Sequence, residues 1–314
     1  MTGRPRRPWL AALMAAFCSG FGHLYVGRWR PALAIPVVVF GGLALTLTAV
    51  LLAGGSSLTA LAAGGSVGLA LWLLQILAAA RIASNTPTDY QLARSNRWWI
   101  YLLYVLAIQV ASAAPAMALR ANVLELFKIP SDSMQPTLLP GDFVAVPKIG
   151  PASAGPPAVG QLAVFAYPRD PEVSYIKRIV ALEGETARVQ RHRLDVEGGI
   201  QSTPCNQPTV EVTDVHGRGR EAHCWQESSP SGLTWPVLVS RAHARGPTAN
   251  WGPEIVPPGE LLMFGDFRTS SSDSRVWGTV PAANLIGRPD QIVFSWDRAR
   301  GPRWDRVGQE LQPR

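Results

Sequence analysis

The sequence predicts a helical membrane region followed by a soluble domain built of β-strands. Two observations support this division. No charged residue occurs between Arg30 and Arg81 or between Arg97 and Arg120, whereas charged residues, prolines and short alternating apolar runs dominate afterwards. In addition, a chain of 314 residues exceeds the usual size of one domain. We therefore expect a membrane region over residues 1–120 and a soluble domain over 121–314.

Three apolar segments of the first part are long enough to cross a bilayer, which takes about 20 helical residues. They lie near 31–53, 58–80 and 98–119. A short uncharged turn separates the first two, which are expected to form a helical hairpin. The third begins with Trp98 and Trp99, whose rings suit the headgroup region of a membrane.

Residues 8–27 are apolar but do not read as a fourth span. Basic residues flank the segment on both sides, and Ser19, Gly20, Gly22 and His23 interrupt it. A re-entrant or interfacial segment is favoured. A cleaved signal peptide is the alternative, because a basic start and a short apolar core fit that as well, but no convincing cleavage site follows the core.

The loops predict the orientation of the chain. The segment between the second and third spans carries Arg81, Arg94 and Arg97 against Asp89, so the positive-inside rule places it in the cytoplasm. The third span then leads outward, and the soluble domain follows it. The net charge of +7 is scattered, with no basic block among aromatic residues, which argues against a nucleic-acid partner.

The soluble part contains short segments rich in Val, Ile, Phe and Tyr and bounded by Gly, Pro or Asp, which predict strands. These segments occupy 141–148, 160–168, 173–185, 260–266 and 290–297. No helical period of useful length occurs among them. Residues 190–250 are richer in Pro, Gly and Arg and are expected to form a polar insertion.

The first residues of this part read IPSDSMQPTLLPGD, at 129–142. Three prolines prevent a helix, so the stretch is expected to be a shaped loop. A serine in it becomes a nucleophile only if a base removes its proton. Histidines occur in this part only within the polar 190–250 region, without a supporting carboxylate motif, which leaves lysine as the base.

Lys177 is the candidate base, in the segment VSYIKRIVAL. Strand alternation places Tyr175, Lys177 and Ile179 on one face, among apolar neighbours. Burial lowers the pKa of a lysine, and a neutral amine can accept a serine proton. A lysine that extends from a strand edge to water remains the alternative. Arg178, on the opposite face, is expected to be solvated.

Three separated motifs together resemble bacterial type I signal peptidases, the Ser/Lys membrane serine proteases. They are PSDSMQPTLLPGD at 130–142, AVFAYPRDPEVSYIKRIVALEGE at 163–185 and GDFRTSSSDSRVWGTVPAANLIGRP at 265–289. Three motifs in the family's order are far more specific than one. The resemblance implies a β-rich catalytic domain of signal-peptidase type, with Ser133 as nucleophile, Lys177 as general base and no cofactor.

The resemblance also implies roles for four other residues. Ser131 would complete the oxyanion hole with the backbone N–H of Ser133. Ser271 would orient the lysine, and Asp273 and Arg275 would form a supporting ion pair. The last motif departs from the family pattern at Phe267, Thr269 and Ser270, three positions that are often polar.

As substrates the resemblance implies signal peptides with small residues at the −1 and −3 positions, cleaved on the outer side of the bacterial inner membrane. Trp296 and Trp304 could rest on that membrane or pack within the domain. Two alternatives stay open: a relative that matures one partner, such as a conjugative pilin, and a non-catalytic membrane scaffold. The three predicted spans and the extra segment at 8–27 are more than the one or two spans usual in the family, so the resemblance does not explain the membrane region.

Cys205 and Cys224 flank a polar stretch of the predicted extracytoplasmic part, where a disulfide is favoured over two free thiols. Two cysteines and His223 are too few ligands for a closed zinc site, so no metal is expected. Met134 and Phe143, close to the serine loop, could line substrate pockets, face lipid or belong to the core.

Overall fold

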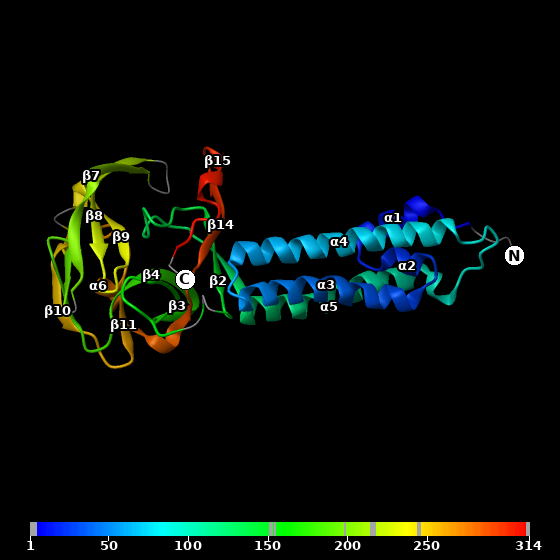
Figure 1. The fold of residues 1–314 in the computed structure, drawn as a ribbon, viewed down its shortest axis with the longest axis horizontal. Helices are drawn as coiled ribbons and strands as arrows, with labels where there is room; N and C mark the ends of the chain where they lie inside the picture. The colour runs from blue at the N-terminus through cyan, green and yellow to red at the C-terminus, as the bar shows by residue number, and fades with distance from the viewer. Residues whose placement is uncertain are drawn as a thin grey trace. The chain divides into compact units, whose positions relative to one another are not determined.

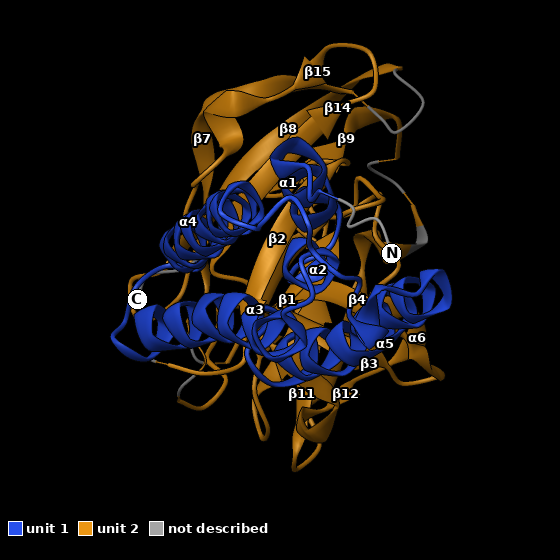
Figure 2. Ribbon diagram, turned by 90° about the vertical axis from the view of Figure 1, so that its right-hand side faces the viewer, with its two compact units in different colours: residues 1–124 blue, residues 125–314 orange. Residues whose placement is uncertain are grey.

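The computed structural model describes residues 5–150, 153, 155–197, 199–213, 218–243 and 246–311. The chain divides into two compact units, residues 1–124 and 125–314, which Figure 2 distinguishes by colour. His216, one of the histidines of the polar region, lies outside the described residues. The units are referred to below as the helical unit and the β unit.

The helical unit contains three long apolar helices and two short ones (Figure 1). Among the described residues, three helices are long and apolar enough to cross a membrane: α3, α4 and α5. The five helices are α1 (Pro8–Phe17), α2 (Phe21–Tyr25), α3 (Trp29–Leu52), α4 (Ser57–Ser84) and α5 (Trp98–Asn122). The turn between α3 and α4 ends at Ser56, whose hydroxyl accepts from the N–H of Thr59 and caps α4.

The segment at 8–27 forms α1 and α2, a pair of short helices that pack against α4. Polar side chains satisfy the backbone where the chain turns between them. Gln75 of α4 donates to Ala15 O at 2.7 Å and accepts from Gly20 N at 3.3 Å. The hydroxyl of Tyr104 of α5 lies 2.7 Å from Ser19 O and 2.6 Å from Ala32 O, and its single proton serves these two acceptors. These bonds supply partners to backbone groups that the interruption of the helix leaves unpaired and that would otherwise need water.

The β unit consists of fifteen described strands arranged in four small sheets. The sheet orders are β1-β2-β14-β15, β10-β5-β6, β12-β11-β4-β3-β13 and β7-β8-β9. The first eight strands are β1 (Leu124–Lys128), β2 (Asp142–Pro147), β3 (Leu162–Tyr167), β4 (Asp170–Ala181), β5 (Thr186–Gln190), β6 (Arg193–Val196), β7 (Gln201–Thr213) and β8 (Gly219–Ser228). The others are β9 (Thr234–Ser240), β10 (Trp251–Ile255), β11 (Glu260–Phe264), β12 (Val280–Pro281), β13 (Leu285–Gly287), β14 (Gln291–Asp297) and β15 (Gly301–Pro302), and one short helix, α6, covers Ser274–Trp277.

Each of the five segments predicted to be strands overlaps one, namely β2, β3, β4, β11 and β14; β4 begins three residues earlier than predicted. The expectation for residues 190–250 is wrong in part. Strand β9 carries the buried residues Trp235, Val237 and Leu238, and Leu194 and Val196 of β6 join the same core as Trp235. Because these strands alternate apolar and polar residues, the average composition of the region hides a buried face.

Four large apolar residues singled out in the sequence, Met134, Phe143, Trp296 and Trp304, divide between core and surface. Met134 is buried in the core with Leu138, and Phe143 is half-buried against Phe294, with ring centroids 5.9 Å apart. Trp296 and Trp304 are 48% and 70% exposed. Contact with a membrane by these two residues stays a prediction.

Candidate active site

Ser133 lies in the loop between β1 and β2, which is anchored at several points. The N–H of Phe267 donates to Ser133 O at 3.1 Å, and that of Leu138 donates to Met134 O at 2.9 Å. Met134, next to Ser133, is 1% exposed in the apolar core. The side chain of Ser133 is therefore presented from a loop that the core holds in place.

Lys177 is placed by the middle strand of the five-stranded sheet. Lys177 lies in β4, where it pairs with Ala163 of β3, and β11 lies on the other side of β4. Its amine donates a hydrogen bond of 2.8 Å from Nζ to Ser133 Oγ. Lys177 and Ser133 are 5% and 8% exposed, so the pair is largely shielded from water. This is the distance that direct proton transfer between the two groups requires.

The surroundings of Lys177 favour its neutral form. Burial lowers the pKa of its amine from 10.5 to about 8, and Arg275 acts in the same direction. Asp273, Asp266 and Asp132 oppose this shift by their negative charges. A pKa near 8 leaves about a tenth of the amine neutral at pH 7, far more than an unperturbed lysine would have, and the neutral amine is the form that a general base needs.

Arg178, expected to be solvated, is instead buried, and that expectation was wrong. Its guanidinium forms an ion pair with Asp266, with Nη2 2.6 Å from Oδ2, and donates to Gly160 O at 2.6 Å. It also lies over the ring of Trp235, 5.1 Å from the centroid. Both faces of β4 are covered at this point, so alternation along the strand does not separate a buried from a solvated side.

Two hydrogen-bond donors lie beside the hydroxyl of Ser133, the candidate nucleophile. The hydroxyls of Ser131 and Ser133 are 3.3 Å apart. The N–H of Ser133 donates to no acceptor among the described residues. If Ser133 Oγ attacks a carbonyl, a hydroxyl and an N–H without an acceptor beside it are the donor types that stabilise a tetrahedral intermediate.

Ser271 lies close to the nucleophile loop but makes no direct bond to the lysine. A Cβ built on Gly265 would meet the side chain of Ser271 and also Ser133 O, so the three residues are in close contact. No hydrogen bond joins Ser271 to Lys177 among the described residues; the hydroxyl lies toward Asp273, whose pKa it helps to lower. The predicted lysine-orienting role of Ser271 is not tested by this geometry.

Asp273 and Arg275 form a fully buried ion pair. Arg275 donates from Nε to Oδ1 at 2.8 Å and from Nη2 to Oδ2 at 2.7 Å. Burial would raise the pKa of Asp273, but Arg275 and the N–H of Gly265 outweigh it, so the pKa is lowered. Arg275 also donates to Arg268 O at 2.7 Å, which fixes the turn that carries Ser271.

Comparison with known proteins places this constellation in a family. Residues 98–295 match the family described as signal peptidase, peptidase S26. The chain belongs to this family. It is accordingly a serine peptidase, and the family acts on the signal peptides of preproteins.

Two relatives in sequence agree with this assignment. A signal peptidase I of Pseudomonas aeruginosa is 31% identical over 220 residues, covering 61% of this chain and 73% of the relative. One from Buchnera aphidicola subsp. Acyrthosiphon pisum is 28% identical over 279 residues, covering 73% and 88%. A crystal structure of a signal peptidase I from Enterococcus faecalis V583 is 21% identical, covers 43% of this chain and 98% of that one, and has a TM-score of 0.27.

A further buried ion pair of this signal peptidase joins Arg268 to Glu227, and the sequence did not reveal it. Arg268 is paired with Glu227, with Nη2 2.5 Å from Oε2, and both side chains are 1% exposed. The same carboxylate accepts from Trp235 Nε1 at 3.0 Å. Glu227 stands in a polar stretch of sequence, where no signal distinguishes it from a solvated glutamate.

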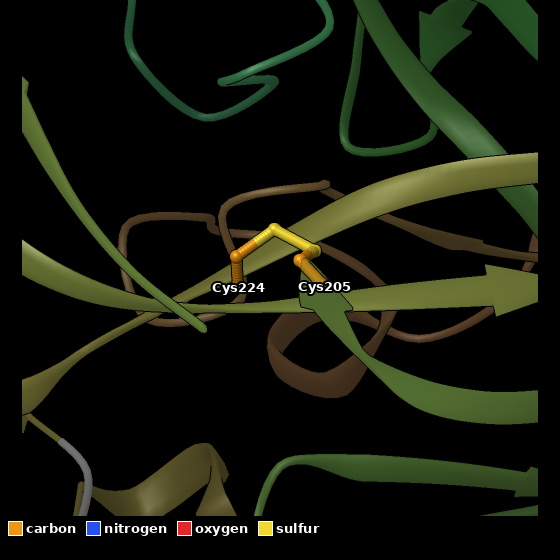
Figure 3. Close-up of a disulfide and its surroundings, with 2 residues drawn as sticks. All are labelled: Cys205 and Cys224. Atoms are coloured by element: carbon orange, nitrogen blue, oxygen red, sulfur yellow. A yellow bond between two sulfur atoms is a disulfide. The ribbon is translucent and has the colours of Figure 1, made fainter. Parts of the chain in front are cut away.

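The two cysteines considered for a disulfide are bonded in the structure. Cys205 of β7 and Cys224 of β8 are joined with a Cα–Cα distance of 5.5 Å (Figure 3). The hairpin that they link also reaches the nucleophile loop, because Gln135 Nε2 donates to Thr213 O at 3.0 Å. No cluster of metal-ligating side chains occurs within the described ranges.

Proposed function

We propose that this signal peptidase cleaves signal peptides with a Ser133/Lys177 dyad. The single observation that carries the proposal is the 2.8 Å hydrogen bond between Lys177 Nζ and Ser133 Oγ in a buried setting. The lowered pKa of the amine supports it, because only the neutral amine accepts a proton.

The reaction follows from this geometry. Lys177 takes the hydroxyl proton, and Ser133 Oγ attacks the carbonyl carbon of the scissile bond. The N–H of Ser133 and the hydroxyl of Ser131 donate to the oxyanion. The lysine ammonium then protonates the leaving amine, and a water molecule, deprotonated by the same amine, releases the acyl group.

The supporting residues have proposed roles as well. Ser271 positions the lysine amine, and the Asp273–Arg275 pair holds the turn that carries it. A Cβ built on Gly265 would meet both Ser271 and the carbonyl of Ser133, and this closeness to the Ser133 loop supports the role. A Ser271→Ala variant should fold normally and cleave more slowly, without a change in the pH at which the enzyme loses activity.

The substrate and the location of the reaction are also proposals. Small residues at −1 and −3 would fit shallow pockets beside the nucleophile loop, with the peptide extended along a strand. Helices α3, α4 and α5 would cross the inner membrane and leave the β unit on its outer side. Their length and apolarity support this arrangement, and the basic loop before α5 supports the direction.

The test is a cleavage assay of the full chain in detergent, on a preprotein with Ala at −1 and −3. Ser133→Ala and Lys177→Ala should each abolish cleavage, while both variants still unfold in a cooperative thermal transition, which shows that they are folded. Cleavage that survives either substitution rejects the dyad. A panel of preproteins separates a general signal peptidase from a relative that matures one partner, and any cleavage excludes a non-catalytic scaffold.

A further inference from the structure

An apolar groove of about 330 Å³ lies within the helical unit, between the first turns of α3 and α5. Trp29 and Leu33 line it from α3, and Trp99, Leu103 and Ala107 line it from α5. These residues are four apart in each helix, so each set forms one stripe on its helix. All five side chains are exposed, although the groove is built almost wholly of apolar atoms.

Arginines stand at the end of the groove where both helices begin. Arg28 and Arg30 flank Trp29, and the guanidinium of Arg30 lies 5.5 Å from the centre of the Trp29 ring. Arg97 immediately precedes α5. The three side chains are exposed, and none forms an ion pair with another described residue.

The charge of the helical unit makes this end strongly positive. Residues 1–124 contain nine arginines, no lysine and a single carboxylate side chain, that of Asp89. The unit therefore cannot neutralise its arginines from within. The complementary partner must carry negative charge.

The two features together point to one kind of ligand. A soluble anion would use the arginines but not the groove, and a neutral lipid would use the groove but not the arginines. The stripe from Trp99 to Ala107 is about 12 Å long, which is short for the interface of a helix crossing a core of about 30 Å. Tryptophans at this level are typical of the headgroup region of a membrane.

We propose that this groove binds one anionic phospholipid. An acyl chain lies between α3 and α5, and the phosphate contacts Arg28, Arg30 and Arg97. The site would give the helical unit a preference for anionic lipid in the leaflet that faces these arginines. This proposal rests on the proposed membrane insertion of the helices and is independent of the Ser133/Lys177 dyad.

Native mass spectrometry of the full chain in neutral detergent tests the proposal, with titration by dioleoylphosphatidylglycerol or dioleoylphosphatidylcholine. The first bound phosphatidylglycerol should have a Kd at least tenfold lower than that of phosphatidylcholine. The variant Arg28→Gln/Arg30→Gln/Arg97→Gln should lose this preference. Ala107→Trp, which fills the groove, should weaken binding of the first lipid by about tenfold.

Matched controls separate a site from general attraction. Arg120→Gln removes an arginine about 34 Å along α5 from Arg97, and Ala113→Trp adds the same ring on an exposed position that does not line the groove. Neither control should change the Kd by more than about twofold. Equal affinity for the two lipids, or equal effects of the controls and the site variants, overturns the proposal.

Two further measurements keep this proposal separate from the proposed function. Alkaline carbonate treatment of membranes tests insertion; release of the chain would reject membrane insertion and the lipid site together. Retention of the chain with no preference for phosphatidylglycerol rejects the lipid site alone. The cleavage assay in detergent reports on the dyad whatever the outcome for the lipid.

Discussion

The amine of Lys177 donates a 2.8 Å hydrogen bond to the hydroxyl of Ser133, across 44 positions of sequence. Both side chains are buried, and the amine is the titratable group that contacts the Ser133 hydroxyl among the described residues. The pH dependence of cleavage and part of the pH dependence of stability should therefore follow this one amine.

Cleavage should increase with pH through a pKa near 8. The neutral form of Lys177 is the proposed base, and its fraction falls about tenfold for each pH unit below that pKa. We expect kcat/KM for a preprotein to follow this curve between pH 6 and pH 10. A profile that is flat over this range, or that changes near pH 6.5 as for histidine, would contradict the assignment of the base.

Replacing Lys177 by methionine should stabilise the folded β unit at neutral pH. Below pH 8 the folded state must bury an ammonium, and the shift in pKa from 10.5 to about 8 corresponds to about 3 kcal/mol. Between pH 8 and 10.5 the unfolded state binds more protons, so the wild type gains stability as the pH rises. Denaturant unfolding of both proteins at pH 7 and pH 10 should show the difference shrinking.

Removing one partner of the Arg178–Asp266 pair should strongly destabilise the protein. Asp266→Ala leaves a buried guanidinium without its counter-charge, which costs about 3–5 kcal/mol. Asp195→Ala is the matched control, because its pair with Arg188 is more than half exposed and contributes about 1 kcal/mol or less. Equal losses of unfolding free energy in the two variants would show that burial of the Arg178 pair has no consequence.

Gly265→Ala should disrupt the active site. The added Cβ would lie 2.6 Å from the carbonyl oxygen of Ser133, a backbone atom that cannot turn away, and would also meet Ser271. We expect kcat to fall at least tenfold. Gly65→Ala is the control, because a Cβ there meets no atom within 4 Å; normal activity of both variants would contradict the close packing.

Loss of the disulfide should weaken the β unit without abolishing the fold. The bond closes a sequence separation of 19 residues, for which chain entropy predicts about 3 kcal/mol. The double variant Cys205→Ala/Cys224→Ala should unfold at a lower temperature and should no longer respond to a reductant. An unchanged melting temperature in the wild type after reduction would contradict this expectation.

Local periodicity predicted the long helices and the main strands, and the order of three motifs predicted the family. The apolar segments near 31–53, 58–80 and 98–119 correspond to α3, α4 and α5, because helix length and hydropathy can be read directly from a window of residues. The five predicted strands are present for the same reason. The three ordered motifs led to the correct family.

These patterns could not predict ion pairs between residues that are far apart in the sequence. Arg178 was expected in water, because alternation along β4 says nothing of a second layer that covers its other face. Glu227 stood in a stretch that composition marked as polar, yet it is 1% exposed and paired with Arg268.

The sequence by itself determined the two-part organisation, the helices, the main strands and the family. Only the tertiary structure decided which charges are buried in pairs, how Ser271 and Gly265 contact the nucleophile loop, and that the amine of Lys177 meets the hydroxyl of Ser133. The physical reason is that helix and strand patterns depend on neighbouring residues, whereas the dielectric environment of a charge depends on every segment that packs around it.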